Sequence, residues 1–97
     1  MIAKGNYYVY LTTNPGKTVL YCGVTNDLKL RLLQHYQNRG NQRTFAGKYY
    51  CYKLIYFETY TDINQAIARE MEIKDWTREK KESLIVAKNP KWNFLIV

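Results

Sequence analysis

The sequence predicts an α+β domain: a small three-stranded antiparallel sheet flanked by helices, in the order β-β-α-β-α-α. Two stretches of aromatic and β-branched residues surround an Asn-Pro-Gly-Lys turn at 14–17, a pattern typical of a β-hairpin. A third stretch of this kind occupies residues 49–60. Three further segments carry apolar residues at helical spacing. A chain of 97 residues is long enough for one hydrophobic core, so we expect a single domain over residues 1–97.

The hairpin strands are predicted at 6–13 and 18–25, because both segments are rich in the residues that favour strands. Alternation along the first strand places Tyr8 and Tyr10 on the same face of the sheet. Tyr21 belongs to the returning strand. We therefore expect Tyr10 and Tyr21 to face each other across the strand pair.

The first helix is predicted at 25–38, where Thr25 or Asn26 can cap the first turn and apolar residues follow at helical spacing. The next ten residues, 39–48, are basic and contain two glycines. Glycine and polar residues between periodic segments are typical of loops, so we expect a basic loop there. The third strand follows it.

Two more helices are predicted at 61–76 and 77–89. Thr61 or Asp62 can cap the earlier helix. The later helix is expected to end at Asn89, because a proline disfavours helical structure at the residue before it. The remaining residues, 91–97, are predicted to form a closing extended segment.

The composition is typical of a globular chain, with 46% hydrophobic residues. No apolar run approaches the about 20 residues that span a bilayer. The N-terminus lacks the apolar block and cleavage site of a secretory signal. Two cysteines are too few for a disulfide framework or a zinc knuckle. These patterns predict a reduced, cytoplasmic protein.

The charge is strongly basic and unevenly distributed. The net charge is +7, and no acidic residue occurs between Leu28 and Phe57. The basic residues in that interval are Lys29, Arg31, Arg39, Arg43, Lys48 and Lys53. Such a segment fits a polyanion, of which nucleic acid is the commonest. A basic surface that only aids solubility is the alternative explanation.

Glu70 is out of place on the second predicted helix. The apolar face of that helix is formed by Ile63, Ala66, Ile67, Met71 and Ile73. Glu70 falls near the centre of this face, and burying an unpaired charge costs several kcal/mol. An ion pair with Lys74, one turn on, is a structural explanation. A metal ligand or an acid–base group at the mouth of a cleft is a functional one.

Arg31 and His35 lie four residues apart on one side of the first predicted helix. Arg31 has the planar donors that bind a phosphate, and His35, the chain's one histidine, can transfer a proton near neutral pH. The alternative is that both residues only fringe the apolar stripe. Tyr10 and Tyr21 nearby would complete a site suited to a phosphodiester.

The tripeptides YVY at 8–10 and YCG at 21–23, with their spacing to Arg31, His35 and Glu70, resemble the GIY-YIG nuclease superfamily. Within it the chain is most similar to the small, single-domain bacterial branch of UPF0213 (YhbQ-like) proteins. The ordered series of motifs extends over nearly the whole chain. The resemblance implies the GIY-YIG fold and a metal-dependent endonuclease that hydrolyses DNA phosphodiesters in one step.

The resemblance also implies roles on the hairpin and first helix. Tyr10 matches the general base toward the attacking water, and Tyr21 a residue that holds the water or the scissile phosphate. Gly23 matches the glycine that lets the chain turn tightly into the helix. Arg31 matches the arginine that stabilises charge on the phosphate, and His35 matches a histidine with a supporting role.

Glu70 matches the glutamate that holds a single Mg²⁺ or Mn²⁺, weakly in the absence of substrate. One carboxylate with several waters is a ligand set that Mg²⁺ accepts. An unperturbed phenol has a pKa near 10, so we expect the positive charge of Arg31, or of Lys17, to lower the pKa of Tyr10. Asn93 loosely matches an asparagine near the end of the family's domain. The implied chemistry requires Tyr10, Tyr21, Arg31 and Glu70 to converge on one concave patch.

The nucleic-acid contacts expected from the basic segment are Lys29, Arg39, Arg43 and Lys48, which would give salt-sensitive and sequence-tolerant binding. Larger members of the superfamily carry separate DNA-binding domains, for which 97 residues leave no room. We therefore expect non-specific or structure-selective cleavage of DNA. The competing hypotheses are a non-catalytic nucleic-acid-binding module with the same fold and a protein-interaction domain with an acidic partner.

Overall fold

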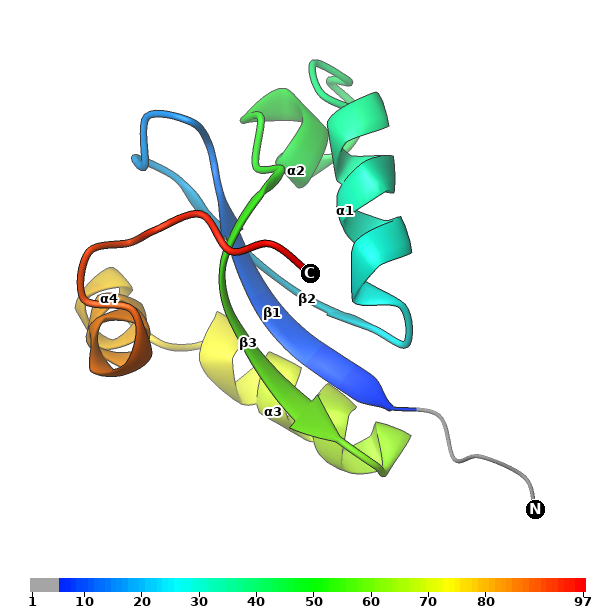
Figure 1. The fold of residues 1–97 in the computed structure, drawn as a ribbon, viewed down its shortest axis with the longest axis vertical. Coiled ribbons are helices and arrows are strands. Elements are labelled where there is room, and N and C mark those ends of the chain that lie inside the picture. The colour runs from blue at the N-terminus through cyan, green and yellow to red at the C-terminus, as the bar shows by residue number, and fades with distance from the viewer. Residues whose placement is uncertain (1–5) are drawn as a thin grey trace.

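A computed structural model describes residues 6–97 of the chain and confirms the predicted fold class (Figure 1). The elements are β1 (Tyr7–Thr13), β2 (Leu20–Thr25), α1 (Leu28–Gln37), α2 (Phe45–Lys48), β3 (Lys53–Tyr60), α3 (Ile63–Lys74) and α4 (Arg78–Lys88). The order β-β-α-β-α-α is as predicted, and the structure adds the one-turn helix α2 within the expected loop. No helix between residues 6 and 97 is long and apolar enough to cross a membrane.

The sheet has the strand order β2-β1-β3 and is antiparallel throughout, so β1 is the central strand. In the pairing of β1 with β2, Tyr10 lies opposite Gly23 and Thr12 lies opposite Tyr21. Tyr10 and Tyr21 are therefore diagonal neighbours on one face, with ring centroids 6.2 Å apart, and do not stand directly opposite each other.

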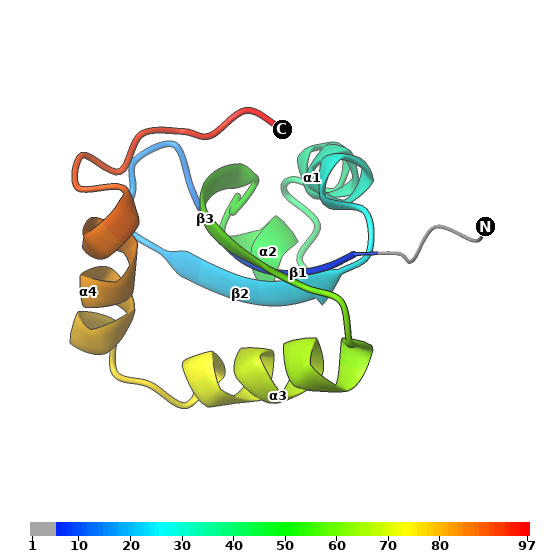
Figure 2. The ribbon, with the colours of Figure 1, turned by 60° about the horizontal axis from the view of Figure 1, so that its bottom comes forward.

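The two faces of the sheet are covered by different helices (Figure 2). The side chains of Tyr10 and Leu54 meet α1 through Leu28 and form a small core on one side. On the other side, α3 and α4 supply Ala66, Ile73 and Ile85 to a larger core, which also contains Val9, Leu11, Cys22, Ile55 and Tyr56. The alternation of side chains along β1 thus divides the molecule into two layers.

The cap of α1 differs from the prediction. Asp27 is the N-cap residue, and its Oδ1 accepts a hydrogen bond from the backbone N–H of Leu30 at 3.0 Å. Thr25 instead accepts from the N–H of Asp27 at 3.1 Å, and so orients the capping residue. The helix begins later than expected because the capping carboxylate belongs to Asp27, which follows both predicted cap residues.

The single-turn helix α2 was predicted as loop. Thr44 caps it, since its hydroxyl accepts from the N–H of Gly47 at 3.1 Å. A Cβ on Gly47 would lie 2.6 Å from the carbonyl oxygen of Asn41, so only glycine fits this close approach. A helix of four residues is too short to produce a periodic pattern in the sequence.

β3 begins at Lys53, later than the strand predicted at 49–60, because Tyr49 caps the end of α2. The helices α3 and α4 agree with the prediction. Asp62 and Thr77 cap α3 and α4. The closing segment lies beside β3, where the N–H of Leu95 donates to the carbonyl of Leu54 at 2.8 Å. The buried amide of Asn89 donates to the carbonyl of Ile55 at 2.9 Å and anchors the start of this segment.

Candidate active site

Tyr10 and His35 form the centre of the predicted site. β1 directs Tyr10 toward α1, and the Tyr10 hydroxyl lies 2.8 Å from Nε2 of His35. The Tyr10 ring has no exposed surface, whereas His35 is half-buried and lines a cavity. The imidazole therefore stands between the buried phenol and solvent.

Gly23 has a different role from the one predicted. It lies inside β2, and its φ is outside the left-handed region, so it makes no tight turn into α1. A Cβ at this position would lie 2.5 Å from the Tyr10 hydroxyl oxygen and 2.6 Å from the carbon that bears it. Gly23 is needed because the Tyr10 ring lies flat across the strand where a side chain would be.

A cavity of about 280 Å³ opens beside this pair and is lined by Tyr21, Arg31, Gln34, His35 and Phe45, among others. The Tyr21 ring meets His35 edge-on, with centroids 5.3 Å apart. It also stacks against Phe45 of α2, with centroids 6.3 Å apart. The predicted residues Tyr10, Tyr21, Arg31 and His35 thus come together. Phe45 was not predicted because its short helix gives no signal in the sequence.

Arg31 has a buried donor with no partner. Its Nε is inaccessible to solvent and has no hydrogen-bond partner within residues 6–97, and its Nη1 lies 3.5 Å from Gln34 Oε1. An unsatisfied buried donor costs about 1–3 kcal/mol. Arg31 also lines the cavity, and a phosphate there is a suitable ligand for its guanidinium, because guanidinium groups bind phosphate through several N–H groups.

The acid–base properties of the pair differ from the prediction. Burial, and then the nearby Tyr21, raise the pKa of Tyr10 well above its ordinary value, and the positive charge of Arg31 offsets only part of this rise. The expectation of a lowered phenol pKa is therefore wrong. Lys17, the other cation that was expected to lower the pKa of Tyr10, lies over the Phe94 ring, 5.1 Å from its centroid. Burial and then Arg31 lower the pKa of His35 to about 4, so the imidazole is neutral at pH 7.

Glu70 does not join this group. It belongs to α3, which covers the opposite face of the sheet (Figure 2). Its side chain is 16% exposed, and its carboxylate lies 3.4 Å from Nζ of Lys74. The predicted convergence on one patch is therefore wrong for Glu70, because Tyr10 and Tyr21 project from the sheet toward α1. The ion pair offered as the structural explanation is present.

Glu70 nevertheless lies close to the site's edge strand. Burial, and then the negative charge of Glu70, raise the pKa of Cys22, the residue that follows Tyr21, to about 12. A second cavity, of about 390 Å³, lies at the start of the edge strand β2 and is lined by Leu20, Phe45, Arg78 and Lys81, among others. Phe45 lines both cavities, so the cavity of Arg31 and His35 adjoins one that extends past this edge to α4.

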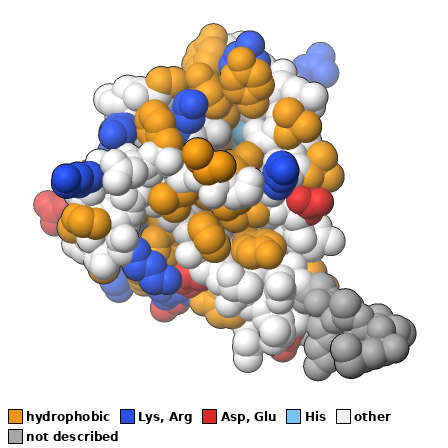
Figure 3. Space-filling model, viewed as in Figure 1, with side chains coloured by type: hydrophobic (Ala, Val, Ile, Leu, Met, Phe, Trp, Pro, Cys, Tyr) orange, Lys and Arg blue, Asp and Glu red, His pale blue; other side chains and the backbone are white. Residues whose placement is uncertain are grey.

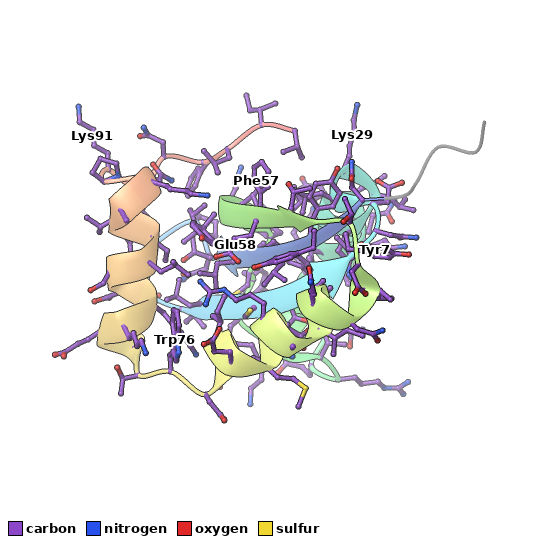
Figure 4. All side chains as sticks on the ribbon, turned by 90° about the horizontal axis from the view of Figure 1, so that it is seen from below. Tyr7, Lys29, Phe57, Glu58, Trp76 and Lys91 are labelled. Atoms are coloured by element: carbon purple, nitrogen blue, oxygen red, sulfur yellow. The ribbon has the colours of Figure 1, made fainter. Side chains whose placement is uncertain are left out.

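Glu58 and Glu70 are half-buried carboxylates on the α3 side, and they differ in how many hydrogen-bond and ion-pair partners they have. Glu58 lies between β3 and α3, while its neighbour Phe57 points to the other face (Figure 4). Tyr56, Tyr60 and Arg69 all donate to the Glu58 carboxylate. Glu70 has only its ion pair with an exposed lysine.

Glu70 fits the ligand set of a weakly held divalent cation. Among residues 6–97, no group of three or more His, Cys, Asp or Glu side chains is arranged to hold a metal ion. A resident metal cage is therefore not part of this region. One carboxylate with open coordination capacity suits Mg²⁺ that keeps several waters and gains phosphate oxygens from a substrate.

The predicted basic contacts come from both ends of α1 and from the segment that follows it. Lys29 lies in the first turn of α1, at the opposite end of that helix from Arg39. The Arg39 guanidinium lies over the Tyr36 ring, 3.8 Å from its centroid, and Lys48 lies over Tyr49 at 5.4 Å. Arg43 is exposed in the loop before α2.

Comparison with known proteins identifies the class to which this fold and site belong. The family model of the GIY-YIG catalytic domain matches residues 6–83. The chain is 35% identical to a UPF0213 protein of Bacillus pumilus, over 84% of this chain and 81% of that protein. It is 32% identical to a UPF0213 protein of Limosilactobacillus reuteri, over 88% of each.

A solved structure agrees with these matches. The solution NMR structure of a UPF0213 protein from Bacillus halodurans superposes with a TM-score of 0.56 and is 27% identical, over 90% of this chain and 89% of that one. The chain therefore belongs to the GIY-YIG nuclease superfamily and, within it, to the UPF0213 branch.

Proposed function

We propose that the protein is a metal-dependent phosphodiesterase that cleaves DNA as an endonuclease. The observation that carries this proposal is the cavity that Tyr21, Arg31 and His35 line together, beside the buried hydroxyl of Tyr10. Membership of a nuclease superfamily supports a nucleic-acid substrate. In this proposal the scissile phosphate occupies the cavity, and its oxygens accept the N–H donors of Arg31.

The proposed reaction is a one-step hydrolysis. Water attacks the phosphorus, the bond to the leaving oxygen breaks, and Arg31 stabilises the charge that develops on the phosphoryl oxygens. The water loses its proton to the Tyr10–His35 pair, in which His35 is the member that lines the cavity. A histidine that is neutral at pH 7 can accept this proton. Tyr21 positions the water or the phosphate.

Glu70 is the residue proposed to hold Mg²⁺ or Mn²⁺, which would supply positive charge beside the leaving oxygen. For one substrate to reach both Arg31 and Glu70, its backbone must follow the edge of β2. Arg78 and Lys81 line the cavity along this edge and supply positive charge there. We therefore place the DNA backbone across this edge strand.

The test is incubation with nicked, branched and single-stranded DNA in the presence of Mg²⁺ or Mn²⁺. The native protein should cleave at least one of these DNAs, and Arg31→Ala should lose about 10²- to 10³-fold in rate, as for loss of one oxyanion donor. Glu70→Ala should lose cleavage. Glu79→Ala, which removes an exposed carboxylate from α4, is the matched control and should retain it. DNA binding without cleavage under every metal condition would contradict the proposal.

A second candidate function is a nucleic-acid-binding module that does not cleave. The observation in its favour is the ion pair of Glu70 with Lys74 on the face opposite Tyr10. The same assay separates the two functions. A non-catalytic module would bind these DNAs with equal affinity in the native protein and in Glu70→Ala, and would release no product from either.

A further inference from the structure

Aromatic and basic side chains are interleaved across one face of the molecule. Consecutive members lie between 3.8 and 5.4 Å apart, measured from a cation to a ring centroid or between two centroids. We call this array the aromatic–cation row. In spatial order its members are Lys17, Phe94, Lys53, Tyr52, Tyr36 and Arg39. Figure 3 shows hydrophobic and basic side chains interleaved over the upper part of this face.

Four separate segments of the chain build the row. Lys17 comes from the β1–β2 turn, Phe94 from the closing segment, and Lys53 from the start of β3. Tyr36 lies near the end of α1. The hydrogen bond from the N–H of Leu95 to β3 fixes the closing segment in this place. Because the backbone on each side is anchored, little freedom remains to be lost when a ligand binds.

The cations of the row are not neutralised by acids. Within residues 6–97, none of Lys17, Lys53 and Arg39 forms an ion pair with a carboxylate. Each lies against an aromatic ring instead, which leaves its charge available to a second partner. The interval between Leu28 and Phe57, which supplies four of the six members, contains no acidic residue. The row is therefore complementary to a chain of negative charges.

Two of the three rings of the row are exposed to solvent. Tyr36 is 46% exposed and Phe94 is 39% exposed. A flat exposed ring beside a cation favours a partner that offers planar groups together with phosphates, because each base can stack while the neighbouring phosphate meets a cation. A duplex is a poorer partner for the row, because its bases cover one another's faces. An acidic peptide is also a poorer partner, because it supplies charge without a planar group at each step.

We propose that the aromatic–cation row binds an unpaired strand of nucleic acid. The strand's bases stack on the exposed rings and its phosphates contact the lysines and the arginine. This binding needs neither the metal nor the cleavage chemistry of the proposed function, so it goes beyond that function. DNA and RNA strands share the chemistry that the row recognises, and the test compares them.

The test measures binding of fluorescein-labelled oligothymidine and oligouridine of about 16 nucleotides, in EDTA without divalent metal. Phe94→Ala and Tyr36→Ala should each weaken binding by about tenfold, the loss of one stacked base. Lys53→Ala should weaken binding and reduce the slope of log K against log salt by about 0.7, the value for one phosphate contact on a single strand. Lys80→Ala is the matched control, because Lys80 lies over Trp76 at 4.4 Å, outside the row.

Inorganic polyphosphate separates stacking from charge, since it carries phosphates without bases. Phe94→Ala should bind polyphosphate as the native protein does, whereas Lys53→Ala should bind it more weakly. Duplex DNA should bind more weakly than either single strand, with no effect of the ring variants. Unchanged oligonucleotide affinity in both ring variants, or equal losses for oligonucleotide and polyphosphate, would overturn the proposal.

Ultraviolet cross-linking of a bromodeoxyuridine oligonucleotide to the native protein tests the same surface without substitution. Cross-links should map to peptides that contain Tyr36, Tyr52 or Phe94, and cross-links confined to other aromatic residues would contradict the row. Failure here is distinct from failure of the proposed function. A protein that binds through the row and never cleaves contradicts the nuclease, whereas cleavage with row variants that bind normally contradicts the row alone.

Discussion

The hydroxyl of Tyr10 lies 2.8 Å from Nε2 of His35, although the two residues are 25 positions apart in the chain. The bond joins the central strand to α1, and the centroid of the Tyr21 ring lies 6.2 Å from that of Tyr10 and 5.3 Å from that of His35. Burial affects the two partners in opposite directions: it raises the pKa of the phenol and lowers that of the imidazole. Both groups are therefore neutral at pH 7, and His35 is the member of the pair that lines the cavity.

His35 should titrate with a midpoint near pH 4, because burial and the charge of Arg31 lower its pKa to about 4. The chain has one histidine, so its ring protons are unambiguous in an NMR titration. An unfolded chain binds this proton near pH 6.5. The contribution of His35 to stability should thus be complete above that pH and decline as the pH falls from 6.5 toward 4. A midpoint of 6.5 or higher in the folded protein would contradict the burial of His35 beside Arg31.

Replacing Tyr10 by Phe removes the hydroxyl and leaves the ring. The free energy of unfolding should fall by about 1 kcal/mol, the usual cost of one buried hydrogen bond. The His35 midpoint should also move, because Nε2 loses its partner. Tyr8→Phe is the control, since Tyr8 lies on the same face of β1 and packs on Phe57 at 6.1 Å. Denaturant unfolding and the NMR titration check both variants, and equal effects in the two would contradict a specific role for the Tyr10 hydroxyl.

Gly23→Ala should destabilise the protein, although alanine is usually better than glycine in a strand. The added methyl would lie 2.5 Å from the Tyr10 hydroxyl oxygen, and the fully buried ring has no space into which it can retreat. We expect a loss of about 1–3 kcal/mol, as for other overpacked cores. Gly16→Ala is the matched control, because its nearest contact is at an ordinary 3.7 Å. Thermal unfolding of the two variants decides the matter, and equal melting temperatures would count against the close approach.

Glu58 should protect the fold against acid. Burial alone would raise the pKa of its carboxyl, but the hydrogen bonds from Arg69, Tyr56 and Tyr60 outweigh burial and lower the pKa to about 2. A lowered carboxyl pKa gives stability that is present above the unfolded value of about 4.3 and is lost as the pH falls toward 2. Glu58→Gln should lower the free energy of unfolding by about 2 kcal/mol at pH 7 and flatten this acid dependence.

Glu72→Gln is the control for that experiment, since Glu72 also contacts Arg69 but is 55% exposed. Surface ion pairs contribute about 0–1 kcal/mol, so this variant should change little. Denaturant unfolding between pH 2 and pH 7 measures both variants. A native-like acid dependence in Glu58→Gln would contradict the assignment.

The fold was predictable because its local patterns agree with its final contacts. The hairpin strands have period-two alternation, and the turn carries proline and glycine between them. Proline after Asn89 marks the end of α4, as observed. The cap of α1 and the helix α2 were not predicted. Each depends on which nearby backbone N–H one side chain, Asp27 or Thr44, accepts a hydrogen bond from, and the sequence pattern does not determine this. The spacing of the motifs predicted that Tyr10, Tyr21, Arg31 and His35 form one site.

The sequence by itself determined the family, the order of the elements and the residues of the candidate site, because these follow from periodicity and motif spacing. The tertiary structure decided how those residues are arranged. It buried Tyr10 against His35 and so reversed the expected direction of the Tyr10 pKa, since desolvation there outweighs the charge of Arg31. It also placed Glu70 on the opposite face, because which side of a sheet a later helix covers depends on long-range packing.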